Sequence, residues 1–214
     1  MRVIVTRPRE QAGPLVERIE ALGHEVVACP LIEIEPLPDE PIDASGYEWL
    51  IVTSPNGADA IARRLVGARP RIAAVGPGTA ERLREHDLEP DFVPRVSSQD
   101  GLLAEFPRPA GRVLFAAAEN ARRRPIDALG ADYLPLYRTR LVRPETPPDG
   151  DLVVLASGSA ARAFAPLGLD VAAVSIGPQT TAVAEKLGLR VVAEAGTHDL
   201  DGLVAAVASV ASRR

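Results

Sequence analysis

The residues best suited to chemistry in this chain are hydroxyl and amide groups at turns between apolar runs and helical patterns. Helix N-termini carry unpaired N–H groups and the positive end of the helix dipole, which suit carboxylates or phosphates. The set therefore predicts a binding site for an anionic ligand, although Ser, Thr and Asn are also ordinary helix caps. The turns are Thr6-Arg7-Pro8, Thr53-Ser54-Pro55-Asn56, Gly76-Pro77-Gly78-Thr79, Ala156-Ser157-Gly158-Ser159 and Gly177-Pro178-Gln179-Thr180.

Other kinds of site are not indicated. The one cysteine, Cys29, permits no internal disulfide and no cysteine metal cluster, and the three histidines lack metal-ligand spacing. The chain has no G-x-S-x-G elbow and no Walker loop, and Pro77 removes an amide that a dinucleotide loop would use. We therefore expect neither a metal nor an organic cofactor.

The elements that position these turns are short apolar runs alternating with helical segments. This pattern predicts an α/β fold with parallel sheets covered on both faces. The first helix is expected over 10–22, with Gly23 as its C-terminal cap. Strands are expected over residues 3–5, 25–28, 50–52, 72–75, 113–115, 152–155, 174–176 and 191–192.

Two proline-rich segments, 35–41 and 143–150, interrupt the pattern and are expected to be linkers. The two halves of the chain are related by an internal repeat. The Gly-Pro turn at Gly76 recurs 101 positions later at Gly177. Asp100-Gly101-Leu102 recurs as Asp201-Gly202-Leu203 at the same offset. The chain has the order a–b–a′–b′, and the repeat leaves open whether a pairs with b or with b′.

Composition limits the class of protein. With 46 % hydrophobic residues and a net charge of −5, the chain is not expected to be disordered. The acidic balance and the low aromatic content argue against nucleic acid as a partner. Because no apolar run approaches ~20 residues and the chain starts in a strand pattern, we expect a cytoplasmic, soluble protein that does not bind membranes. Nothing in the sequence suggests an oligomer, so a monomer is expected.

The order and spacing of the motifs along nearly the whole chain resemble those of the uroporphyrinogen-III synthase family. The resemblance implies two similar open parallel-sheet, flavodoxin-like domains joined by a two-stranded antiparallel linker, with one domain inserted in the other. Domain one would be 1–35 with 143–214, domain two 40–140, and the hinge strands about 31–37 and 138–144. The matching motifs are Val5-Thr6-Arg7-Pro8, Thr53-Ser54-Pro55-Asn56-Gly57-Ala58, Val75-Gly76-Pro77-Gly78-Thr79, Leu136-Tyr137-Arg138-Thr139, Ser157-Gly158-Ser159-Ala160, Ile176-Gly177-Pro178-Gln179-Thr180 and Asp201-Gly202-Leu203.

The reaction that the resemblance implies is the cyclisation of hydroxymethylbilane, a linear tetrapyrrole with many carboxylates. Water is lost and ring D is inverted, giving uroporphyrinogen III for tetrapyrrole (haem, sirohaem, cobalamin) biosynthesis. The enzyme class is a cyclising hydro-lyase without a cofactor, its site lies in the crevice between the domains, and its substrate is handed over by the bilane-forming enzyme.

The resemblance also assigns the site residues. Tyr137 is the expected catalytic residue, as a donor to the leaving hydroxyl, and its alternative is a strand tyrosine whose hydroxyl is satisfied. One departure is Ala117 and Ala118, which replace an arginine-glycine pair that family members often carry before the position of Glu119. The expected substrate-binding residues are Thr6, Arg7, Ser54, Asn56, Gly76, Thr79, Arg122, Ser157, Ser159, Gly177 and Thr180.

Two alternatives remain at this point. A non-catalytic tetrapyrrole- or anion-binding regulatory module would keep the hinge and the glycine turns without needing Tyr137. A two-domain small-anion binding protein of unrelated role would not need the Leu136-Tyr137-Arg138-Thr139 element. The presence of Tyr137 favours the enzyme over both.

Overall fold

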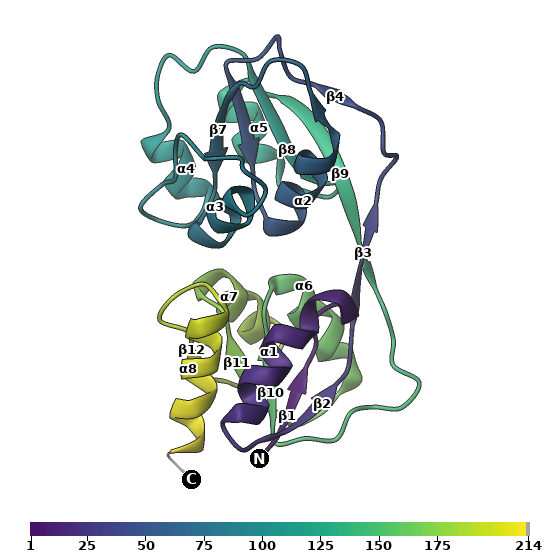
Figure 1. Cartoon of the computed structure of the whole chain (residues 1–214). Helices are drawn as coiled ribbons and strands as arrows, with labels where there is room; N and C mark the ends of the chain where they lie inside the picture. The colour runs from purple at the N-terminus through teal and green to yellow at the C-terminus, as the bar shows by residue number, and fades with distance from the viewer. Residues whose placement is uncertain (213–214) are drawn as a thin grey trace. The chain divides into compact units, whose positions relative to one another are not determined.

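The computed structural model describes residues 1–212 and divides into two compact α/β units (Figure 1). Unit 1 combines Met1–Glu33 with the chain from Arg140 onward, and unit 2 is Ile34–Thr139. Both boundaries fall inside two strands, β3 and β9, and not in the proline-rich segments. That each unit folds as an independent domain stays a prediction.

Unit 1 contains one parallel five-stranded sheet, with strands in the order β12-β11-β10-β1-β2. In chain order this is 2-1-3-4-5, the order of flavodoxin-like folds. The first part of the chain thus pairs with the last part, which the repeat alone did not determine. The elements are β1 (Arg2–Val5), α1 (Arg9–Ala21), β2 (Glu25–Ala28), β10 (Leu152–Leu155), α6 (Gly158–Phe164), η1 (Ala165–Leu167), β11 (Ala172–Ser175), α7 (Pro178–Lys186), β12 (Val191–Glu194) and α8 (Leu200–Ala211).

Helices cover both faces of this sheet. Val3 and Val5 of β1 are fully buried against α1 and α8, whereas Ile4 is fully buried on the face covered by α6 and α7 (Figure 1). Successive side chains of a strand point to opposite faces, so a strand between two helical layers must be apolar at every position. The continuous apolar runs in the sequence are explained by this packing.

Unit 2 contains a second five-stranded sheet, in the order β3-β9-β8-β5-β7. β5, β7, β8 and β9 are parallel, with α2 and α3 on one face and α4 and α5 on the other. The elements are β3 (Ile32–Pro36), β4 (Ile42–Asp43), β5 (Trp49–Val52), α2 (Pro55–Arg64), β6 (Leu65–Val66), β7 (Arg71–Ala74), α3 (Pro77–Arg84), α4 (Gln99–Glu105), β8 (Val113–Ala118), α5 (Arg123–Leu129) and β9 (Asp132–Leu141).

The predicted hinge strands differ from β3 and β9 in extent. Leu37 N–H donates to Leu136 O at 3.2 Å and Val142 N–H donates to Leu31 O at 2.9 Å, so the two segments run antiparallel. β9 starts well before the predicted hinge strand 138–144, and β3 occupies the edge of the sheet of unit 2. The short strands β4 and β6 form a separate pair that the sequence did not predict, because two-residue strands carry no periodic pattern.

The repeated Asp-Gly-Leu sequence marks the start of a helix in each unit. Ser98 caps α4 by accepting from Gly101 N at 2.9 Å, and Asp199 caps α8 by accepting from Gly202 N at 2.8 Å. A Cβ atom at Gly101 would clash with the carbonyl oxygen of Val96, and the corresponding clash at Gly202 is with Thr197 O. Close backbone approach at the cap explains why this glycine recurs.

We expect Gly101→Ala to lower the free energy of unfolding by about 1–3 kcal/mol, the usual cost of overpacking. Gly78→Ala is the matched control in the first turn of α3, because nothing lies within 4 Å of its Cβ position. Thermal unfolding followed by circular dichroism measures both. Equal melting temperatures for the two variants would contradict the clash.

Candidate active site

Three of the predicted site residues meet in unit 2. Tyr137 lies on β9 with 8 % of its surface exposed, and Ser54 is the N-cap of α2, just after β5. The Ser54 Oγ and Tyr137 Oη atoms are 2.8 Å apart. The Asn56 side chain, in the first turn of α2, also hydrogen-bonds the Tyr137 hydroxyl. The structure thus places a phenol and two polar side chains together at the start of a helix.

A β-bulge in β9 aims Tyr137 at α2. Ala117 is paired with Pro135, but Ala118 is paired with Tyr137, so β9 carries one extra residue, Leu136. As a result Leu136 and Tyr137 are both buried in the cluster packed under α2 and α3. Regular alternation would turn Tyr137 to the opposite face of the sheet. Pro135 favours the irregularity because proline has no N–H to donate to a ladder.

The electrostatics of Tyr137 favour the protonated phenol. Burial raises the pKa of Tyr137, and the hydrogen bonds with Ser54 and Asn56 act in the opposite direction without cancelling the effect. A phenol whose pKa lies above its ordinary value of about 10 is neutral at pH 7. Tyr137 therefore carries its phenol proton at physiological pH.

The remaining predicted residues of unit 2 lie at the same edge of its sheet. Gly76 and Thr79 follow β7, and Arg122 follows β8, as Ser54 follows β5. The carboxyl ends of parallel strands all lie at the same end of the sheet, and open α/β sheets bind their ligands there. Thr79 is 5 % exposed inside α3, and Arg122 is exposed at the N-cap of α5.

Unit 1 presents its predicted residues at the carboxyl edge of its own sheet. Ser157 caps α6, where its Oγ accepts from Ala160 N at 3.1 Å, and Ser159 follows in the first turn. Thr180 lies in the first turn of α7 and is 5 % exposed. Gly177 is the N-cap of α7, and a Cβ there would lie 2.7 Å from the ring of His198. Packing alone therefore accounts for glycine at this position.

Thr6 and Arg7 behave differently from each other. Thr6 is fully buried, and its hydroxyl donates to Val154 O at 3.0 Å. Because this hydrogen bond uses the hydroxyl hydrogen inside the sheet, Thr6 is not among the residues proposed to bind the substrate. Arg7 is half-buried, and burial lowers its pKa. Its Nη2 donates to Gln11 Oε1 at 3.4 Å, whereas its buried Nε has no partner among residues 1–212. Arg7 thus keeps one buried donor that no described residue uses.

Arg138 is already engaged by a carboxylate. Its Nε and Nη2 donate to the two carboxylate oxygens of Glu119 at 2.6 and 2.8 Å, and this pairing holds the pKa of Glu119 below its usual value. Ala117 and Ala118 lie in β8 just before Glu119, and neither side chain can pair with a carboxylate.

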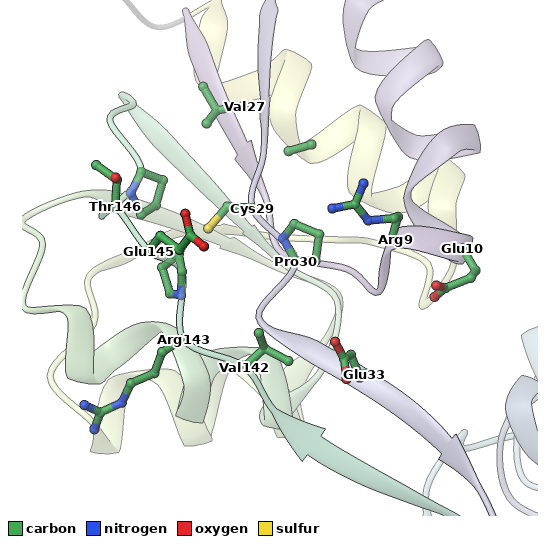
Figure 2. A pocket seen from close by; sticks show the side chains of 13 residues that line it. Arg9, Glu10, Val27, Cys29, Pro30, Glu33, Val142, Arg143, Glu145 and Thr146 are labelled. Atoms are coloured by element: carbon green, nitrogen blue, oxygen red, sulfur yellow. The ribbon is translucent and has the colours of Figure 1, made fainter.

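A separate hollow of about 480 Å³ lies in unit 1, between the start of α1, the end of β2 and the segment 142–148 (Figure 2). Cys29 and Glu145 are among its lining residues. None of the predicted site residues lines it.

No group of three or more potential metal ligands gathers in the described part of the chain. The same part contains no helix that is long and apolar enough to cross a membrane.

The thiol of Cys29 is expected to react slowly in the folded protein. It is 7 % exposed, and burial raises its pKa, so little of the reactive thiolate is present near neutral pH. Labelling with a disulfide reagent should be many-fold slower in buffer than in urea, because burial both shields the sulfur from the reagent and disfavours the thiolate. Equal rates would show that Cys29 is accessible, and because it is the one cysteine, the signal has a single source.

Comparison with known proteins identifies the family. A family model described as uroporphyrinogen-III synthase HemD matches residues 13–205. The chain belongs to the uroporphyrinogen-III synthase family. A uroporphyrinogen-III synthase of Synechococcus elongatus is 32 % identical over 96 % of the chain and 93 % of the relative. A putative uroporphyrinogen-III synthase of Methanocaldococcus jannaschii is 25 % identical over 89 % of the chain and 91 % of the relative.

Solved structures agree at the level of the fold. The chain is similar to a mutant uroporphyrinogen III synthase of Thermus thermophilus, with a TM-score of 0.69 and 17 % identity over 100 % of both chains. It is also similar to a uroporphyrinogen-III synthetase of Helicobacter pylori, with a TM-score of 0.66 and 18 % identity over 98 % of this chain and 100 % of the other. The predictions of the family, the α/β fold and an enzyme of porphyrin biosynthesis are confirmed.

Proposed function

We propose that the chain converts hydroxymethylbilane to uroporphyrinogen III, with Tyr137 as the group that protonates the leaving hydroxyl. The observation that carries this proposal is the neutral, buried Tyr137 hydroxyl held against Ser54 and Asn56 at 2.8 Å from the serine oxygen. Hydroxide is a poor leaving group, so a proton donor at the hydroxymethyl oxygen accelerates its departure.

The chemical steps balance with Tyr137 alone. The phenol proton passes to the hydroxymethyl oxygen, the C–O bond breaks with its electron pair on oxygen, and water leaves. Ring A becomes a cationic azafulvene and Tyr137 a phenolate. Ring D attacks through its substituted carbon, and the spiro intermediate fragments and recloses with ring D inverted. The last C–H proton returns to the phenolate, so the net change is the loss of one water.

The carboxylates of the substrate are assigned to the helix N-termini in each unit. Hydroxyls and backbone N–H groups there donate to carboxylates, and Arg7 adds a charge-assisted donor. These contacts would fix the conformation of the linear substrate, which matters because closure without inversion gives the type I isomer. The proposed binding residues besides Tyr137 are Arg7, Gly76, Thr79, Arg122, Ser157, Ser159, Gly177 and Thr180.

Three further expectations stay predictions. They are a cytoplasmic location, a monomeric state, and the handover of the substrate from the bilane-forming enzyme. The segments 1–35 with 143–214 and 40–140 are likewise proposed as the two domains. The alternative is a tetrapyrrole- or anion-binding module without activity, which would not need the Tyr137 hydroxyl.

An isomer assay tests the proposal directly. Freshly prepared hydroxymethylbilane is incubated with the protein, the product is oxidised, and the type I and type III porphyrins are separated by chromatography. We expect a dominant type III product formed faster than the type I product of the no-enzyme control. Type I alone at the rate of that control would overturn the proposed function and favour the binding module.

A further inference from the structure

Beyond its helix cap, Ser54 still has its one hydroxyl hydrogen to donate, and Tyr137 lies within hydrogen-bonding distance of it. The Ser54 Oγ atom accepts the N–H of Gly57 at 3.1 Å, which fixes the oxygen at the start of α2. The same atom lies 2.8 Å from Tyr137 Oη. A serine hydroxyl has one hydrogen to donate. If Tyr137 gives its own hydrogen to the substrate, the Ser54 hydrogen must point at Oη.

The donors around Tyr137 are arranged for the anion that proton transfer leaves behind. Burial disfavours a phenolate, because a charge in a low-dielectric site is costly unless it is hydrogen-bonded. The hydroxyl of Ser54 and the side chain of Asn56 both lower the pKa of Tyr137 against the effect of burial. Both residues also lie at the N-terminus of the ten-residue helix α2, whose dipole favours negative charge.

We propose that Ser54 and Asn56 are positioning residues that act through Tyr137, and that neither is a ligand for a substrate carboxylate. Their hydrogen bonds orient the phenol so that its proton points away from α2, and they stabilise the phenolate while the tetrapyrrole rearranges. A carboxylate at Ser54 would compete with Tyr137 for the one hydroxyl hydrogen. The proposal rests on the proposed role of Tyr137 as proton donor, and it replaces the sequence-based assignment of Ser54 and Asn56 to carboxylate binding.

A double-mutant cycle tests the proposal. Type III formation is measured for the wild type, Ser54→Ala, Tyr137→Phe and the double variant. We expect Ser54→Ala to lower kcat by about tenfold at unchanged KM, because a hydrogen bond to a charged group is lost. In the Tyr137→Phe background the same change should alter kcat by less than about twofold, because residues that act through one another are not additive. Asn56→Ala should follow the same pattern.

The outcomes distinguish a failure of the positioning role of Ser54 from a failure of the proposed synthase function. A rise in KM of similar size in both backgrounds would assign Ser54 to the carboxylates and overturn the positioning role, with the synthase function intact. Absence of type III product with the wild type would instead overturn the proposed function.

Two further variants separate orientation from helix capping. Ser98→Ala removes the equivalent cap from α4 in the same unit, where Ser98 Oγ accepts from Gly101 N at 2.9 Å. It should keep the wild-type kcat. Ser54→Thr keeps both the cap and the hydroxyl and should recover most of the kcat lost in Ser54→Ala. An equal loss of kcat in Ser98→Ala and Ser54→Ala would show that capping, and not Tyr137, is responsible.

Discussion

Tyr137→Phe is expected to lower kcat for type III formation by at least about 10²-fold, the lower end of what a positioned general acid contributes. The substitution removes one oxygen from a side chain that is 8 % exposed and leaves its packing in place. KM should change little, because the phenol hydrogen is needed mainly when the C–O bond breaks. Steady-state kinetics with separation of the isomers measures both quantities. The type I fraction should rise as the uncatalysed closure overtakes the enzyme.

Stability must be checked beside turnover. The lost hydrogen bond with Ser54 should lower the free energy of unfolding by about 1 kcal/mol. Tyr47→Phe is the matched control in unit 2, because it also removes one hydrogen-bonded phenol oxygen, 2.9 Å from Asp132 Oδ2. It should keep the wild-type kcat. Unchanged turnover in Tyr137→Phe would show that Tyr137 is not the general acid and that its site only binds the substrate.

Local pattern predicts the elements of this fold better than their pairing. The strand over Val3, Ile4 and Val5 and the helix ending before Gly23 match β1 and α1 within a residue, because burial on two faces and a left-handed cap are local requirements. The placement of β1 beside β10 joins Val3 to Leu152. Such pairing between distant segments depends on which strands bury their apolar faces together under shared helices. The pattern of a single segment does not contain this information.

The site shows the same division. The residue types at the turns and the strand tyrosine were visible in the sequence, and the structure brings Ser54, Asn56 and Tyr137 together. The direction of each side chain was not visible. The bulge at Leu136, next to Pro135, turns Tyr137 toward α2, whereas the hydroxyl of Thr6 points into the sheet. A proline inside a strand pattern is the one sequence signal that could have indicated the bulge.

The second large effect concerns the stability of the two units. Phe164 in unit 1 and Phe115 in unit 2 are both fully buried. Phe-to-Ala changes in cores cost about 3–5 kcal/mol, a large share of the roughly 5–15 kcal/mol that stabilises a native protein. We expect Phe164→Ala to increase amide hydrogen exchange in unit 1 while the strands of unit 2 keep their protection. Exchange measured by mass spectrometry on peptides from each unit reports this.

The corresponding substitution in unit 2, Phe115→Ala, is expected to affect both units. The reason is that unit 2 is one continuous segment, whereas unit 1 is made of two segments. Folded unit 2 keeps the two parts of unit 1 close, where Val142 N–H donates to Leu31 O at 2.9 Å. If unit 2 unfolds, those parts are joined by a flexible loop of ~100 residues, whose closure costs about 4–5 kcal/mol by the relation used for cross-links. Phe115→Ala should therefore increase exchange in both units. Equal losses of protection in both units for both variants would instead mean that the chain unfolds as one cooperative body, and the two proposed domains would not be independent.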